Sequence, residues 1–165
     1  MAKDIGSQAT ILHCAELPME SFSDPDYGNV RWQTLFTADR TETSGLTCGV
    51  AHLRPGDCLA LHRHAHPETY FGLSGRARIM VDGVAHELTP GTAIFIPGGA
   101  IHGMFADTED AQILYTFPAN SFSEIEYQFL MDAAPKAPAV AAVQARQLDL
   151  MDALSEDYSA DTTLQ

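Results

Sequence analysis

The chain has 165 residues, of which 45% are hydrophobic and 8% aromatic, a composition typical of one globular domain with a buried core. Nine Lys and Arg residues against 22 Asp and Glu residues give a formal net charge of −13, which would repel a phosphate backbone, so we expect no nucleic-acid partner. No apolar run approaches the roughly 18 residues of a membrane-spanning helix, and the N-terminal MAKDIGSQAT lacks the apolar stretch of a signal peptide, so we expect a cytoplasmic protein with no membrane partner.

Residues 1–30 are expected to form an N-terminal arm. They contain at most one candidate strand, Thr10–Cys14, followed by a loop rich in Ser, Asp and Pro. The three cysteines of the chain, Cys14, Cys48 and Cys58, are odd in number, widely spaced and without a CxxC pair. This pattern argues against a disulfide framework and against a thiolate zinc site.

Residues 31–118 alternate short apolar runs with Gly, Pro and Asp, which predicts a series of strands. The Asp82-Gly83 pair between two such runs indicates a two-residue hairpin, because both central positions of a type I′ turn need a positive φ. Short strands without intervening helical periodicity predict an all-β fold, either an antiparallel sandwich or a barrel. The expected strands are Arg31–Phe36, Leu46–Leu53, Cys58–His64, Thr69–Leu73, Ala77–Val81, Val84–Leu88, Ala93–Ile96, Ile101–Phe105 and Gln112–Phe117.

Residues 119–165 are expected to form a C-terminal extension. Its first part, SFSEIEYQFLMDA, fits either a helix or an edge strand, and AAPKAPA is typical of a linker. Beyond the linker a modest apolar stripe predicts a helix, and the last residues, SEDYSADTTLQ, form a frayed tail in this interpretation. The stripe consists of Val140, Val143, Leu148, Met151 and Leu154.

Four residues are candidate metal ligands. His62 and His64 lie two residues apart on an expected strand, so their side chains share one face. Glu68 follows across the next turn, and His102 follows the Gly- and Pro-rich segment GTAIFIPGGAI. Three imidazoles and one carboxylate suit one divalent transition-metal ion, and residue type leaves Fe, Mn, Ni, Co and Zn open. The absence of thiolates argues against a purely structural zinc site.

On these residues the sequence resembles the cupin superfamily, whose two motifs are G-x5-H-x-H-x3,4-E-x6-G and G-x5-P-x-G-x2-H-x3-N. The resemblance covers about residues 45–117 and implies a cupin jelly-roll barrel, also called a double-stranded β-helix, within residues 31–118. It also implies that the four candidate ligands bind the metal, and that the protein pairs as a homodimer. Ala106 replaces the final Asn, a position that is not a ligand. The matching residues are Gly56, His62, His64, Glu68, Gly75, Gly91, Pro97, Gly99 and His102.

Tyr70 shares the strand face of Glu68 and is the candidate catalytic residue. The order H-x-H-x3-E-x-Y with a distant His resembles the small cupin-type dimethylsulfoniopropionate (DMSP) lyases. In that family the metal would bind the substrate carboxylate as a Lewis acid. The resemblance then implies that Tyr70 removes the proton α to this carboxylate, and β-elimination gives dimethyl sulfide and acrylate. The alternative role for Tyr70 is an aromatic wall of the pocket.

Two other readings of the function stay open, because a cupin fold alone does not fix the activity. One is an Fe(II)-dependent dioxygenase or another small-molecule enzyme, such as an isomerase or a decarboxylase. The other is a non-enzymatic domain that binds or senses a small molecule. All three readings have a small molecule as the expected partner. Of the three, we expect one of the enzymes, which would depend on a metal ion.

The alternation of residues along the expected strands and turns also predicts a structural position for five further residues. His66, on the turn between two strands, is expected to be solvated, with support of the ligands or a role as an extra ligand as the alternatives. Arg76 and Arg78 alternate with an apolar set and are expected on the surface. Trp32 and Tyr115 are expected in the core or in a pocket wall.

Overall fold

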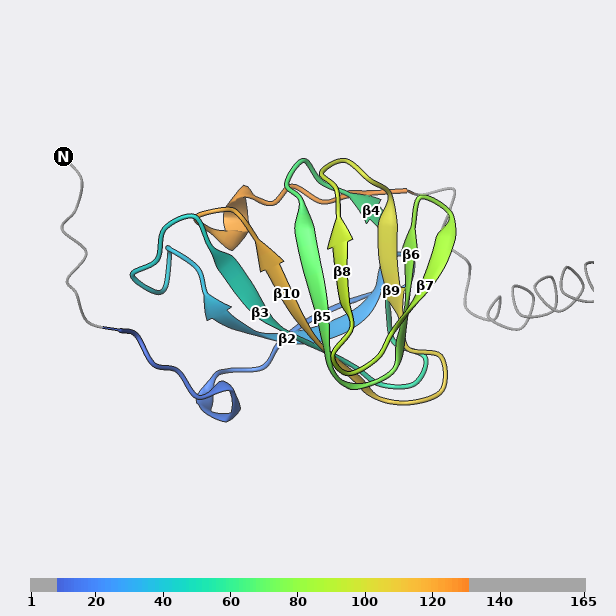
Figure 1. The fold of residues 1–165 in the computed structure, drawn as a ribbon, viewed down its shortest axis with the longest axis horizontal. Coiled ribbons are helices and arrows are strands. Elements are labelled where there is room, and N and C mark those ends of the chain that lie inside the picture. The colour runs from blue at the N-terminus through green and yellow to red at the C-terminus, as the bar shows by residue number, and fades with distance from the viewer. Residues whose placement is uncertain (1–8, 131–165) are drawn as a thin grey trace, which may run out of the picture. The chain divides into compact units, whose positions relative to one another are not determined.

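Short antiparallel strands joined by tight turns build most of the computed structural model, which describes residues 9–130 (Figure 1). Two 3-10 turns, Cys14–Glu16 and Phe122–Glu124, are the helical elements among these residues. The strands are β1 Glu20–Asp24, β2 Gly28–Phe36, β3 Thr47–Leu53, β4 Cys58–Arg63, β5 Glu68–Gly75, β6 Ala77–Val81, β7 Val84–Leu88, β8 Ala93–Ile96, β9 His102–Phe105, β10 Ala111–Phe117 and β11 Gln128–Phe129. The predicted all-β fold is therefore confirmed.

The strands form one 11-stranded sheet that curls into a nearly closed barrel, in the order β7-β6-β9-β4-β2-β3-β10-β5-β8. β1 pairs with β2, and β11 pairs with β4. The strands β6, β7 and β8 have the predicted bounds. The hairpin between β6 and β7 has the expected turn, since Asp82 has a φ of 46° and Gly83 a φ of 82°.

The N-terminal segment differs from the prediction, because residues 10–13 form no strand. The buried side chain of Gln33 holds this segment instead: its Nε2 donates to the carbonyls of Cys14, at 2.6 Å, and Leu17, at 2.9 Å. The first strand is β1, which pairs with β2 along its whole length. Its alternation places Phe22 against the barrel core.

The segment after Pro118 contains the 3-10 turn Phe122–Glu124 and then β11, so the edge-strand alternative is correct for Gln128–Phe129. β11 pairs with β4, with Phe129 opposite His62. The sheet thus includes one strand before residue 31 in the sequence, β1, and one strand after residue 118, β11. The predicted helix over residues 140–154 lies outside the described residues, and the three-part division of the chain stays a prediction.

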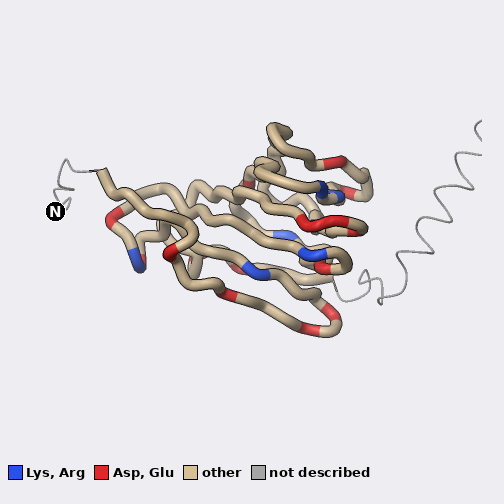
Figure 2. The backbone as a smooth tube through the Cα atoms, turned by 90° about the horizontal axis from the view of Figure 1, so that it is seen from below, with Lys and Arg blue, Asp and Glu red and all other residues tan. Residues whose placement is uncertain are grey.

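Opposite charges gather on the turns and strand ends at one end of the barrel (Figure 2). Arg76 lies 3.1 Å from Glu87 and 3.2 Å from Glu109. Arg78 makes two bonds of 2.9 Å to the carboxylate of Asp107. Arg76 is exposed, as predicted, whereas Arg78 is only partly exposed and lies over the Phe105 ring at 4.6 Å.

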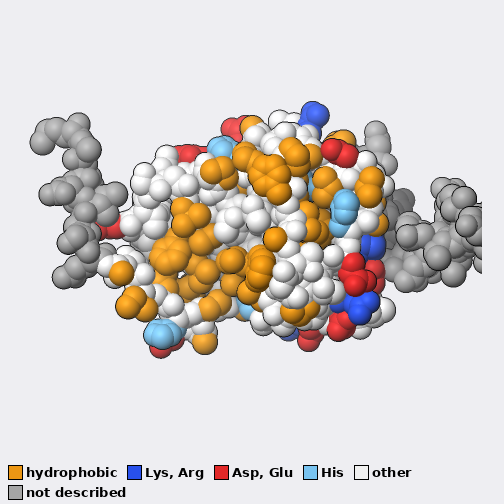
Figure 3. All heavy atoms as spheres, in the orientation of Figure 1, with side chains coloured by type: hydrophobic (Ala, Val, Ile, Leu, Met, Phe, Trp, Pro, Cys, Tyr) orange, Lys and Arg blue, Asp and Glu red, His pale blue; other side chains and the backbone are white. Residues whose placement is uncertain are grey.

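Apolar side chains reach the surface on the face formed by β10, β5 and β8 (Figure 3). Phe71 and Leu73 of β5 and Phe95 of β8 are 38%, 42% and 67% exposed. The homodimer expected from the resemblance stays a prediction. Among the described residues there is no helix that is long and apolar enough to cross a membrane.

Candidate metal centre and pocket

Three buried histidines meet inside the barrel. His62 lies on β4 and pairs directly with His102, the first residue of β9. His64 follows two residues after His62, so both imidazoles point to the same side. The ligand nitrogens of the three residues lie within 4.8 Å of one another. Strand parity places His62 and His64 on one face, and the pairing of β4 with β9 adds His102. The three residues therefore form one cluster that could hold a metal ion.

The backbone fixes which nitrogen of each imidazole faces the cluster. The Nδ1 atoms lie 2.8 Å from the Ala60 carbonyl for His62, 2.8 Å from the His66 carbonyl for His64, and 3.0 Å from the Ala100 carbonyl for His102. A carbonyl only accepts hydrogen bonds, so each Nδ1 carries the hydrogen and each Nε2 keeps its lone pair. This is the tautomer that binds a metal through Nε2.

Two of these Nε2 atoms have no hydrogen-bond partner. Those of His62 and His64 are fully buried, and no described residue bonds to them. Burial, followed by the charge of His102, lowers the pKa of His62 to about 3, so its imidazole stays neutral. A buried lone pair without a partner is costly unless a ligand occupies it. The donor set therefore fits a divalent metal ion.

Glu68, the first residue of β5, brings a carboxylate to the same cluster. Its Oε2 lies 3.3 Å from Nε2 of His64 and 3.1 Å from Nε2 of His102. Burial acts to raise the pKa of Glu68, but the interactions of its carboxylate with the imidazoles of His102 and His64 outweigh it and hold the pKa below its usual value. In the reverse direction, burial acts to lower the pKa of His64, and Glu68 raises it overall. The carboxylate is thus ionised and available.

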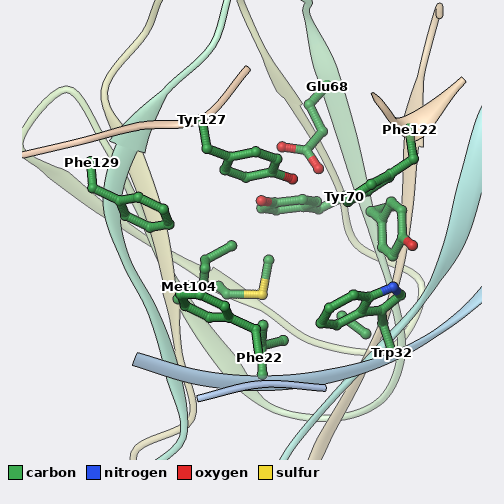
Figure 4. A pocket seen from close by; sticks show the side chains of 12 residues that line it. Phe22, Trp32, Glu68, Tyr70, Met104, Phe122, Tyr127 and Phe129 are labelled. Atoms are coloured by element: carbon green, nitrogen blue, oxygen red, sulfur yellow. The ribbon is translucent and has the colours of Figure 1, made fainter. Parts of the chain in front are cut away.

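Tyr70 lies two residues after Glu68 and points into the same space, as predicted (Figure 4). The side chain is buried, and its ring centroid lies 6.3 Å from that of His102. Burial, followed by the charge of Glu68, raises the pKa of Tyr70 well above its ordinary value. In this structure its hydroxyl is therefore protonated.

A cavity of about 210 Å³ opens beside the cluster and is bounded almost entirely by apolar and aromatic side chains. Of the described residues that line it, Glu68 is the one that carries a charge. The carboxylate of Glu68 and the hydroxyls of Tyr70 and Tyr127 lie together at one end, and Phe22 and Trp32 lie at the other (Figure 4). The lining residues are Phe22, Val30, Trp32, Ala51, Leu59, Glu68, Tyr70, Met104, Tyr115, Phe122, Tyr127 and Phe129.

Tyr127 is the residue that the sequence prediction missed. Its ring centroid lies 4.9 Å from that of His62 and 5.4 Å from that of His64. Burial, followed by the charge of Glu68, raises its pKa well above the ordinary value. The signal was the spacing of Tyr127 and Phe129, two apart like a strand face, within a segment that also fitted a helix.

The other residues given a role from the pattern divide into two groups. Trp32 and Tyr115 line the pocket, as expected. His66 lies on its turn, where its carbonyl accepts the hydrogen bond that orients His64. Its own Nδ1 is buried without a hydrogen-bond partner among the described residues, so His66 is not simply solvated. Of the three expected roles, support of the ligands is the one that this carbonyl contact favours.

Comparisons with known proteins agree with this geometry. A family model described as "Cupin domain" matches residues 49–117. The DMSP lyase DddW of Ruegeria pomeroyi is 41% identical over 117 residues, which are 71% of this chain and 77% of that protein. This identity, over most of both chains, shows a common family.

Solved structures share the fold. The polyketide cyclase RemF of Streptomyces resistomycificus superposes with a TM-score of 0.65 at 19% identity, over 77% of this chain and 90% of that one. A structure described under "DMSP lyases RdDddP and RnDddQII" superposes with a TM-score of 0.53 at 24% identity, over 61% of this chain and 52% of that one. Barrel, motif and relatives coincide, and the chain belongs to the cupin superfamily, in the same family as DddW.

Proposed function

We propose that this protein is a metal-dependent lyase that cleaves DMSP to dimethyl sulfide and acrylate. The observation that carries the proposal is the 41% identity to the lyase DddW over 77% of that protein. The pocket supports it, because the buried phenol of Tyr70 and the carboxylate of Glu68 both line one small cavity, and that carboxylate also lies against His64 and His102. A cavity of about 210 Å³ suits a substrate smaller than a drug-sized molecule.

In this proposal the ligands of one divalent transition-metal ion are His62, His64, Glu68 and His102. The Nε2 lone pairs and the ionised carboxylate are the donors. When bound, the ion supplies a Lewis acid for the substrate carboxylate and a positive charge that lowers the pKa of a nearby phenol. The protein holds the donors in place by the three carbonyl bonds to Nδ1, and no thiolate takes part.

Tyr70 is the proposed base. Its phenolate removes the proton from the carbon next to the substrate carboxylate, and that electron pair forms the new C=C bond. The C–S bond breaks, and its electron pair leaves with sulfur, which turns the sulfonium cation into neutral dimethyl sulfide. Tyr70 is left protonated and returns its proton to solvent. The apolar walls around Tyr70 exclude water, which strengthens the electrostatic interactions of the reacting groups.

The test is release of dimethyl sulfide by the purified protein. Its metal content is measured first, and the protein is then incubated with DMSP while the headspace is sampled by gas chromatography. Metal-dependent release, abolished by a chelator and restored by adding the ion back, supports the lyase. A metal-containing protein that releases no sulfide contradicts it, and oxygen uptake by an Fe(II)-containing sample would instead indicate the dioxygenase.

A further inference from the structure

We infer that the aromatic end of the pocket recognises a small onium cation, so that the site binds zwitterionic carboxylates bearing either a sulfonium or a quaternary ammonium group. The inference rests on the proposed function only for placing the carboxylate at the Glu68 end of the cavity. In this inference the onium group of the ligand contacts the faces of aromatic rings, chiefly that of Trp32. The inference also adds trimethylammonium carboxylates as a ligand class.

The rings at this end come from two paired strands, with Phe22 on β1 and Trp32 on β2, and both line the cavity. Phe129 of β11 also lines it, between Phe22 and the His62 side, where its ring centroid lies 5.6 Å from that of His62. Phe22 and Phe129 stack with centroids 6.1 Å apart and an interplanar angle of 8°. In Figure 4, Phe22 and Trp32 lie across the cavity from the Glu68 carboxylate. The distal end therefore combines several π-systems in one wall.

No residue within 9–130 supplies a counter-ion at this end. Among these residues Glu68 is the only charged side chain that lines the cavity, and it belongs to the opposite end. A cation placed beside Trp32 and Phe22 therefore loses water without gaining an ion pair, which in a purely aliphatic pocket would be a net cost. Ring faces supply the missing attraction, because the π quadrupole presents negative charge to the cation, and Trp is the strongest of the aromatic side chains in this respect.

A purely apolar wall and an aromatic wall differ in whether they bind a neutral ligand or a cation of the same shape more tightly. An apolar wall without π attraction prefers a neutral group over a cation of the same shape. An aromatic wall that acts through cation–π contact prefers the cation. Two isosteric ligands make the comparison direct. These are 3-(trimethylammonio)propanoate and 4,4-dimethylpentanoate, which differ only in the replacement of N⁺ by carbon and share the carboxylate that would face the metal end.

The experiment measures the affinity of the metal-containing protein for both ligands by isothermal titration calorimetry. We expect the ammonium compound to bind about tenfold more tightly than its neutral isostere. The substitution Trp32→Leu should reduce this ratio to about one or below, and Trp32→Phe should keep most of it. Phe95→Leu removes an exposed ring that does not line the cavity and serves as the matched control, with an unchanged ratio.

Equal or tighter binding of the neutral isostere by the unmodified protein overturns the inference, and this comparison needs no variant. If Trp32→Leu fails to fold, Phe22→Leu tests the same wall from another strand. The proposed function fails separately. Release of dimethyl sulfide without discrimination between the isosteres refutes cation recognition alone. Discrimination without release refutes the lyase and leaves cation recognition standing.

Discussion

Oε2 of Glu68 lies 3.1 Å from Nε2 of His102, and both side chains are buried inside the barrel. The two residues are 34 positions apart and come from β5 and β9, which are not neighbours in the sheet. The barrel interior, rather than strand pairing, therefore brings the carboxylate to the histidines. This relationship makes Glu68 testable as a proposed ligand independently of any activity.

The substitution Glu68→Gln should weaken metal binding. The amide keeps the size of the side chain but removes the negative charge that faces two imidazoles. We expect the metal affinity to fall roughly tenfold to a hundredfold or more, since even the loss of an outer partner of a ligand has effects of this size. Titration against a competing chelator measures it. Glu87→Gln, at an exposed ion pair, is the control, and wild-type affinity in Glu68→Gln would show that Glu68 is not a ligand.

Metal affinity should fall as the pH drops below the pKa of His64. The pKa of His64 is raised above its ordinary 6.5, so in acid a proton occupies the imidazole and competes with the metal. Since the pKa of His62 is about 3, His62 stays neutral over the same range and adds no proton competition. We therefore expect a loss of about tenfold per pH unit for this one proton below the pKa of His64.

Chelator competition between pH 5.5 and 8 measures this dependence. The exposed substitution His86→Gln should leave the curve unchanged. An affinity that stays constant across this range would contradict the assignment of His64 as a ligand that must lose a proton.

Tyr70→Phe and Tyr127→Phe form a matched pair, because each removes one hydroxyl from a ring that lines the same pocket. If Tyr70 is the base, Tyr70→Phe lowers the rate of sulfide release by roughly a hundredfold or more. Tyr127→Phe should lower it less than about tenfold, since that hydroxyl takes no proton in the proposed reaction. Both variants should keep their metal. Equal losses in the two variants would show that Tyr70 has no special role.

Gly75→Ala should destabilise the barrel more than Gly91→Ala. Both glycines have a positive φ, +64° and +84°, so alanine strains the backbone at either position by about 1–2 kcal/mol. At Gly75 a Cβ would also overlap the carbonyl of Asp110, whereas at Gly91 it would meet no atom of the described part of the chain within 4 Å. We expect a further loss of about 1–3 kcal/mol in the free energy of unfolding of Gly75→Ala. Urea unfolding of both variants measures it, and equal losses would contradict the overlap.

The central strands and the histidine cluster were predictable because their signals are local. The Asp82-Gly83 turn fixes the register of β6 against β7 over a few residues. The spacing of two between His62 and His64 decides that they share a face, whatever the rest of the fold does. The same parity placed Tyr70 beside Glu68. Each of these inferences needs only the geometry of one strand or one hairpin.

The aromatic end of the pocket was not predictable in this way. β1 contains Ser and Asp, which are not typical of strands, and it is held by pairing with β2. β11 has two residues, too few for any periodic pattern, and forms because β4 offers it a partner. Phe22, Tyr127 and Phe129 reach the pocket through these non-local pairings. Local preference cannot reveal contacts that the assembled barrel imposes.

The three imidazoles are oriented by the carbonyls of Ala60, His66 and Ala100. Every amino acid carries such a carbonyl, so the orientation of the histidines depends on the backbone conformation and not on which side chains lie at these three positions. Substitutions of Ala60, His66 or Ala100 that preserve the backbone conformation should keep these three hydrogen bonds. The walls of the cavity can therefore change, and with them the molecule that the pocket accepts, without changing how the three histidines are oriented.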